Sequence, residues 1–129
     1  MHVENYIKKL KPKREGENIW INLTSNKLHP VLKHLKAIGV TRISSITGVD
    51  TGKTIEIIYH FIHKKKSINI RIAVGKGKPA VNTITYIYPG ANLFERELSE
   101  MLGIEIRNHP NLKKLFLSEE SPPHPLRKS

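Results

Sequence analysis

Three successive segments with the residue pattern of β-strands constrain the fold of this chain more than any other feature. Residues 40–47, 54–64 and 67–74 are rich in isoleucine, valine, threonine and aromatic residues, and the third alternates apolar and polar side chains. The connections between them are short, namely GVDTGK and a turn around Lys65 and Lys66. Short connections of this kind join antiparallel neighbours. The pattern therefore predicts an antiparallel meander with one face covered and one face wet.

Two segments with helical periodicity flank the meander. Residues 26–38 place apolar side chains on one helical face, and Gly39 follows as a C-terminal stop. In residues 92–102, Asn92 and Glu95 have the spacing of a capping box. The apolar stripes are Leu28, Val31, Leu32, Leu35 and Ile38 in the first helix, and Phe94, Leu98, Met101 and Leu102 in the second. We expect both helices to cover the sheet.

The chain divides by composition into three parts. Residues 1–17 are polar, carry a basic run and contain Pro12, which predicts a solvated basic arm. Residues 18–117 hold the predicted strands and helices, beginning with a short strand at 18–24, and form a single domain. Residues 118–129 are rich in proline and predict an extended tail. The expected fold class is α+β: an antiparallel or mixed sheet, made of the meander and the N-terminal strand, with helices on one face.

The patterns that could carry catalysis or bind a ligand fail their spacing requirements. GVDTGKT at 48–54 has too few residues between its glycines for a phosphate loop and precedes a strand, so it predicts a hairpin turn. The chain has no cysteine, which excludes disulfides, thiolate zinc sites and Cys-ligated iron–sulfur clusters. His60 and His63 are three residues apart on a predicted strand and so face opposite ways. We expect no catalytic residue and no bound metal, flavin or nucleotide.

The positive net charge is compatible with several classes of binding partner. Lys and Arg total 22 against 11 acidic residues, a formal net charge of +11 that is dispersed along the chain. Such a surface suits nucleic acid, an acidic protein or an anionic membrane surface. No apolar run approaches the about 18 residues of a membrane span, and the first residues lack the pattern of a secretory signal. A soluble cytoplasmic protein is expected, and a free-standing basic nucleic-acid-binding domain remains an alternative.

The most specific pattern is the stretch YPGANLFERELSEMLGIEIRNHPNLKKLF at 88–116, together with HPLRK at 124–128. It combines an aromatic-Pro-Gly-Ala-Asn turn, a Glu-Arg-Glu group, a glycine, a His-Pro pair and a basic-leucine run. This arrangement resembles the signature of the C-subunit family of respiratory complex I (NADH-quinone oxidoreductase), which energy-converting membrane-bound nickel–iron hydrogenases share. The matching residues are Tyr88, Pro89, Gly90, Ala91, Asn92, Glu95, Arg96, Glu97, Glu100, Gly103, His109, Pro110, Lys113, His124, Pro125 and Arg127. The resemblance extends over residues 18–129, although Glu100 replaces the usual Asp and Lys113 stands where Arg is frequent.

The resemblance implies a non-catalytic scaffold and assembly subunit of a membrane-associated oxidoreductase complex. The subunit would lie in the peripheral arm, at the inner face of the cell membrane, against the large catalytic-type subunit and the iron–sulfur subunit. It would hold no cofactor, because the partner subunits carry the iron–sulfur clusters and, in hydrogenases, nickel and iron. The signature residues would be interface and scaffold residues, with their charges satisfied across the subunit boundary, and the 118–129 tail would dock on a partner.

Two weaker features bear on the branch of the family. The early end of the chain favours the hydrogenase-type branch over a quinone-linked dehydrogenase, and the high lysine and isoleucine content favours an archaeal or thermophilic source.

Overall fold

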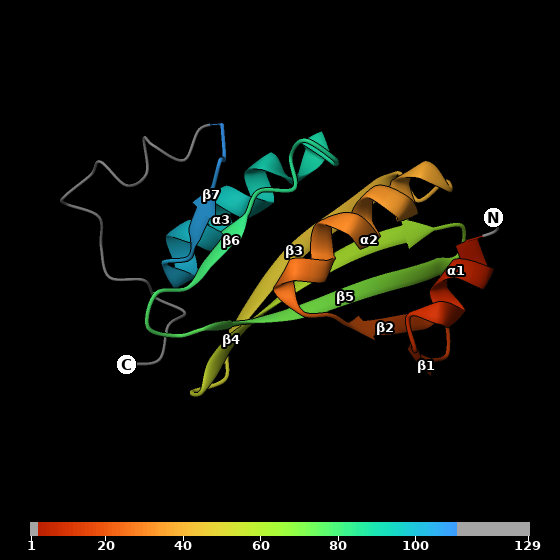
Figure 1. Cartoon of the computed structure of the whole chain (residues 1–129), viewed down its shortest axis with the longest axis horizontal. Coiled ribbons are helices and arrows are strands. Elements are labelled where there is room, and N and C mark those ends of the chain that lie inside the picture. The colour runs from red at the N-terminus through yellow and green to blue at the C-terminus, as the bar shows by residue number, and fades with distance from the viewer. Residues whose placement is uncertain (1–2, 111–129) are drawn as a thin grey trace.

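A five-stranded mixed sheet forms the centre of the fold (Figure 1). The structure, a computed structural model, describes residues 3–110. The strands are β1 (Lys13–Glu15), β2 (Asn18–Asn22), β3 (Arg42–Asp50), β4 (Thr54–His63) and β5 (Lys66–Gly75), in the spatial order β1-β2-β5-β4-β3. The antiparallel meander of β3, β4 and β5 is confirmed. The sheet is mixed because β2 pairs with β5 in parallel, with Ile19 opposite Ile68.

Two helices cover one face of this sheet, as expected. They are α2 (Ser25–Ala37) and α3 (Asn92–Leu102), and Figure 1 shows α2 along the sheet and α3 on the side of β3. The strand register places large apolar side chains on the face beneath them, and the core forms there. These buried side chains are Ile19, Ile21, Ile46, Ile55, Ile57, Tyr59, Phe61, Ile68, Ile70 and Ile72. The predicted α+β class is therefore confirmed for the described residues.

The predicted end of α2 is also confirmed. Gly39 has a φ of +118°, and the backbone N–H of Val40 donates to the carbonyl of Leu35 at 2.9 Å. The N–H of Gly39 donates to the carbonyl of Lys36 at 3.2 Å. This pair of bonds is the Schellman arrangement, which satisfies the last helical carbonyls and turns the chain toward β3.

The remaining elements form a small unit beside α3. Residues 80–88 fit either a strand or a short helix by sequence, and the structure has the short strand β6 (Ala80–Asn82) followed by a turn. The 3-10 helix η1 (Pro89–Ala91) leads into α3, and β7 (Glu105–Arg107) then pairs in parallel with β6. The expected tail at 118–129 and the end of the predicted domain at 117 lie outside the described residues.

The N-terminal residues differ from the predicted solvated arm. Residues 3–15 contain the helix α1 (Val3–Lys9) and the edge strand β1, which pairs antiparallel with β2. Ile7 is only 1% exposed, and the Tyr6 ring stacks on His34 of α2 with 4.0 Å between centroids. Glu4 forms ion pairs with Arg14 and, at 3.3 Å, with Lys66.

The prediction of a solvated arm is wrong because the basic run contains a short apolar pattern. Val3, Tyr6, Ile7 and Leu10 stand at positions i, i+3, i+4 and i+7 of a helical face, and all four pack in or against the core. Their burial outweighs the charge of the surrounding lysines, which lie on the solvent side of the same helix.

Gly48 allows α3 to approach β3 closely, and this gives a testable result. A Cβ at Gly48 would lie 2.6 Å from Cδ1 of Leu98 and closer still to Cδ1 of Leu102. Gly48→Val should therefore overpack the helix–sheet contact and lower the free energy of unfolding by about 1–3 kcal/mol. Urea denaturation of the purified protein measures the change. Gly77→Val is the matched control, because nothing lies within 4 Å of its Cβ position. Equal stability of the two variants would contradict the role given to Gly48.

Candidate functional site

The signature segment folds into η1, α3, β7 and the turn after β7, on the covered face of the sheet (Figure 1). Of the predicted site residues, Lys113, His124, Pro125 and Arg127 lie outside the described residues. The structure divides the side chains of the described segment into a buried group and a group on the outer side of α3. Of the predicted residues outside these two groups, Ala91 is buried, Asn92 and Gly103 are half-buried, and Pro89, Gly90 and Pro110 are exposed. The two groups have different physical roles.

Glu95 is the centre of the buried group. It is 1% exposed, and its carboxylate accepts hydrogen bonds from the Thr83 hydroxyl and, at 2.9 Å, from the backbone N–H of Ile84. Burial raises the pKa of Glu95 above its ordinary value, and the two hydrogen bonds oppose that rise. The carboxylate therefore ties the start of α3 to the turn that follows β6.

The predicted capping box is wrong. The helix α3 continues directly from η1, its N-cap residue is Ala91, and no side chain caps it. The Oδ1 atom of Asn92 is buried and has no hydrogen-bond partner among residues 3–110. Glu95 reaches the 83–84 turn instead of the N-terminus of its own helix because it falls on the helix face that packs inward.

Tyr88 anchors the other end of the segment. Its ring packs against Phe61 with 4.9 Å between centroids, and its hydroxyl donates to the carbonyl of Val40 at 2.6 Å. Burial raises the pKa of Tyr88 to about 12, so the phenol stays neutral and remains a donor at physiological pH. Lys36 of α2 adds a hydrogen bond to the carbonyl of Ile87. The turn at 88–91 is thereby fixed to the end of α2 and to the sheet.

His109 completes the buried group. Its side chain is buried, with Nε2 3.2 Å from the carbonyl oxygen of Asn92 and 3.8 Å from a carboxylate oxygen of Glu95. The expectation that Glu95 and His109 meet a partner across a subunit boundary does not fit this geometry, because both lie inside the domain. The sequence carried a signal for this: Glu95 stands three and seven residues before Leu98 and Leu102, on the same helical face.

The group on the outer side of α3 forms one continuous stripe along that helix. It consists of Leu93, Arg96, Glu97, Glu100 and Met101, at positions i, i+3, i+4, i+7 and i+8, and we call it the α3 stripe. Leu93 is 63% and Met101 41% exposed, which places two large apolar side chains in solvent around a charged centre. The prediction that Met101 packs in the core is therefore wrong. Arg96 is half-buried, and its buried Nε has no hydrogen-bond partner among residues 3–110.

Apolar and charged side chains lie together on this part of the surface. Within residues 3–110, no three His, Asp or Glu side chains gather as metal ligands would. His60 contacts Thr47 and Asn69 on the open face of the sheet, apart from the signature segment. The side chains of Glu95 and His109 are buried.

The fold and the site together define an α+β domain with a buried polar turn at one side and an exposed helical stripe beside it. The family described as "Respiratory-chain NADH dehydrogenase, 30 Kd subunit" matches residues 21–129, and the chain belongs to it. The resemblance seen in the signature segment is thereby confirmed.

Three curated relatives are named as subunits of NADH-quinone oxidoreductase. The NADH-quinone oxidoreductase C-subunit of Roseiflexus is 35% identical over 91 residues, which cover 67% of this chain and 52% of the relative. NADH-quinone oxidoreductase subunit 5 of Thermus thermophilus is 26% identical over 86% of this chain and 60% of the relative. The C/D-subunit of Buchnera aphidicola is 40% identical over 56% of this chain and 12% of the relative. The chain therefore spans about 60% or less of the length of each of these relatives.

Two solved structures share the fold. The trypsin-resistant fragment of Nqo5 aligns with a TM-score of 0.76 at 23% identity, over 87% of this chain and all of that one. A chain of the membrane-bound sulfane sulfur reductase, an archaeal respiratory membrane complex, aligns with a TM-score of 0.82 at 20% identity, over 96% of this chain and 82% of that one.

Proposed function

We propose that this protein is a non-catalytic scaffold and assembly subunit in the peripheral arm of a membrane-associated oxidoreductase complex. The observation that carries the proposal is the α3 stripe, which lies within the family signature and exposes Leu93, Glu97 and Met101 on the outer side of the helix. Leu93 and Met101 supply apolar area, and Arg96, Glu97 and Glu100 supply charges that can fix the register of a partner. The large catalytic-type subunit and the iron–sulfur subunit are the proposed partners.

The half-buried state of Arg96 supports a partner at this surface. A buried donor without an acceptor costs free energy, and the Nε of Arg96 is such a donor within the described residues. A carboxylate or carbonyl from an adjoining subunit would supply the acceptor. The buried group of Tyr88, Glu95 and His109 then has a supporting role, because it holds α3 at a fixed position on the sheet.

The proposal extends to cofactors and location. We infer that this chain holds no cofactor and that the iron–sulfur clusters, and nickel and iron in a hydrogenase, belong to its partner subunits. In residues 3–110, none of the helices has the length and hydrophobicity needed to cross a bilayer. The protein would reach the inner face of the cell membrane through the complex. The curated relatives are subunits of oxidoreductases, which favours this function over the nucleic-acid-binding alternative.

Charge reversal on the α3 stripe tests the function. Glu97 is exposed, so Glu97→Lys should leave the stability of the purified protein within about 0.5 kcal/mol of the wild type. In the complex it places an unmatched charge in the interface, at a cost of about 2–5 kcal/mol, and the amount of assembled complex should fall by about tenfold or more. Native gels, and oxidoreductase activity in a host lacking its own copy, measure assembly and turnover.

Glu15→Lys provides the control for the same charge change. Glu15 is an exposed acid on β1, away from the stripe, and its reversal should leave assembly unchanged. Turnover per assembled complex should be normal for both variants, since no reacting group is removed. Normal assembly of Glu97→Lys would contradict the interface, and loss of turnover in a fully assembled complex would contradict the non-catalytic role.

A further inference from the structure

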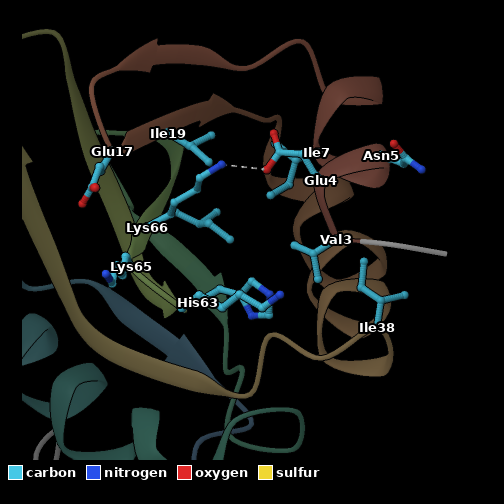
Figure 2. A pocket seen from close by; sticks show the side chains of 12 residues that line it. Val3, Glu4, Asn5, Ile7, Glu17, Ile19, Ile38, His63, Lys65 and Lys66 are labelled. Atoms are coloured by element: carbon cyan, nitrogen blue, oxygen red, sulfur yellow. Dashed lines mark hydrogen bonds and ion pairs between the residues drawn. The ribbon is translucent and has the colours of Figure 1, made fainter.

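A second surface lies at the other end of the sheet from α3, between α1 and the turn that joins β4 to β5 (Figures 1 and 2). It is a groove of about 950 Å³, and we call it the N-terminal groove. Its apolar lining is Val3, Ile7, Ile19, Ile38 and Ile68, and its polar lining is Glu4, Asn5, Glu17, His63, Lys64, Lys65 and Lys66. None of the signature residues lines it.

The cationic side of the groove comes from one tight turn. Three successive lysines follow His63, and Lys66 is paired with Glu4 at 3.3 Å, as Figure 2 shows. Lys64 and Lys65 are exposed, and neither has an acidic partner among residues 3–110. The groove therefore joins an apolar floor to two lysines that have no acidic partner among residues 3–110, and Glu17 is the one acid of the lining that forms no ion pair in the same residues.

The backbone of this turn is strained in a way that its sequence does not relieve. Lys64 has a φ of +56°, in the left-handed region that glycine and asparagine adopt more readily. A lysine at this position costs stability, and a second and a third lysine beside it add repulsion between like charges. A positive φ at this position is what a two-residue connection between antiparallel strands requires, so the turn holds the lysines in a defined place at the rim of the groove.

Half of the groove's lining lies outside the region that defines the family, and none of it lies in the signature segment. The family match begins at residue 21, whereas Val3, Glu4, Asn5, Ile7, Glu17 and Ile19 precede it. A contact at the groove would therefore be separate from any contact that the signature segment makes.

We infer that the N-terminal groove binds a segment of a partner protein in which apolar anchor residues are flanked by Asp or Glu. The apolar floor accepts the anchors, and Lys64 and Lys65 pair with the carboxylates. Charge complementarity favours this occupant, because a chain with a net charge of +11 repels basic segments. The inference rests on the proposed function in one respect: the partner is taken to be another subunit of the same complex.

Cross-linking in the purified complex identifies the occupant. A photo-reactive phenylalanine analogue replaces Asn5, an exposed residue that lines the groove and supplies neither of the two charges, and mass spectrometry identifies the residues that it captures. The expected product is a segment of another subunit with acidic residues on either side of an apolar one. Capture of a basic or uncharged segment, capture of a lipid, or no cross-link would overturn the inference.

Salt resistance of the complex provides a second and independent readout. The double variant Lys64→Glu/Lys65→Glu should lower the fraction of this protein retained in the complex at moderate salt by about fivefold or more. The control is Lys8→Glu/Lys9→Glu, a neighbouring pair of exposed lysines on α1 that does not line the groove. Equal retention of the two double variants would overturn the inference.

Two further measurements keep the outcomes distinct. Both double variants should show the melting temperature of the wild type, so that a loss of retention reports binding rather than folding. Vesicles containing phosphatidylglycerol should bind both double variants to the same degree. If only the Lys64→Glu/Lys65→Glu variant bound the vesicles more weakly, the groove would bind a membrane surface and the inference of a protein partner would be wrong.

Co-purification of the wild-type protein with other subunits shows whether a failure concerns the groove alone or the proposed function as well. If the wild-type protein purifies with other subunits while the groove variant is retained as well as its control, the groove inference fails alone. If the wild-type protein purifies with no other subunit, the proposed function fails and the groove inference fails with it.

Discussion

Glu95→Ala is expected to lower the free energy of unfolding by about 2–4 kcal/mol. The substitution removes the acceptor of two buried hydrogen bonds, from the Thr83 hydroxyl and from the backbone N–H of Ile84. Each of these donors would remain buried without a partner. The free-energy cost of burying the unpaired donors is larger than the contribution of the two hydrogen bonds themselves. Chemical denaturation monitored by circular dichroism measures the difference from the wild type.

Glu95→Gln separates the hydrogen bonds from the charge. The amide oxygen can still accept from Ile84, and the amide nitrogen can donate to the Thr83 oxygen, so the loss at neutral pH should be below about 1.5 kcal/mol. A stability loss for Gln as large as that for Ala would show that the hydrogen bonds are not the source of the effect.

The pH dependence of the two proteins should differ in a defined direction. Burial raises the pKa of Glu95 in the folded state, so its contribution to stability is fully present below the unfolded-state pKa of 4.5 and is lost as the pH rises through the folded-state value. Relative to Glu95→Gln, the wild type should therefore gain stability as the pH falls. His109 and Tyr59 face the same carboxylate, and both are retained in the two proteins. A stability difference between the two proteins that is independent of pH would contradict the raised pKa.

Tyr88→Ala is expected to have an effect of similar or larger size, about 3–5 kcal/mol. Tyr88 is 2% exposed, and the substitution leaves a cavity against Phe61 and removes the donor to Val40. Tyr88→Phe keeps the ring and loses only the hydroxyl, so it should cost about 1–2 kcal/mol. Thermal and chemical unfolding of the purified variants gives both values.

Tyr86→Ala is the matched control for this series. Tyr86 is the same residue type in the same turn and is 78% exposed, so its truncation should change stability by about 0.5 kcal/mol or less. If Tyr86→Ala and Tyr88→Ala were equally destabilising, the anchoring role of Tyr88 would be wrong.

The sequence predicted the strands and helices in which apolar residues recur regularly, because that spacing places them on the one face that is buried. The strands of the meander and the helix at 92–102 each repeat apolar residues at the spacing of their secondary structure, and the structure has them within a few residues of the expected ends. The N-terminal helix was missed because polar and charged residues outnumber its apolar ones. The parallel pairing of β2 with β5 has no local signal, since the two strands are far apart in the chain.

The sequence predicted a signature segment, but it did not predict how the structure divides that segment into buried and exposed side chains. Carboxylates are rarely buried inside a domain, so Glu95 was expected in a capping box and, with Glu97 and Glu100, at a subunit boundary. The opposite error was made for Met101, since apolar residues are expected inside. Both side chains depart from their usual environments: Glu95 because the 83–84 turn supplies two donors, and Met101 because α3 buries only one stripe.

The parallel pairing of β2 with β5 also sets the order in which the sheet can form. Hairpins between β3, β4 and β5 close over a few residues, whereas Asn18 has to find Ser67 across a helix and the two strands β3 and β4. Closing so long a loop is entropically costly until the later strands are already in place as a template. β2 therefore acquires its neighbour β5 only after α2, β3 and β4 have all been synthesised, although its other neighbour, β1, is available from the start.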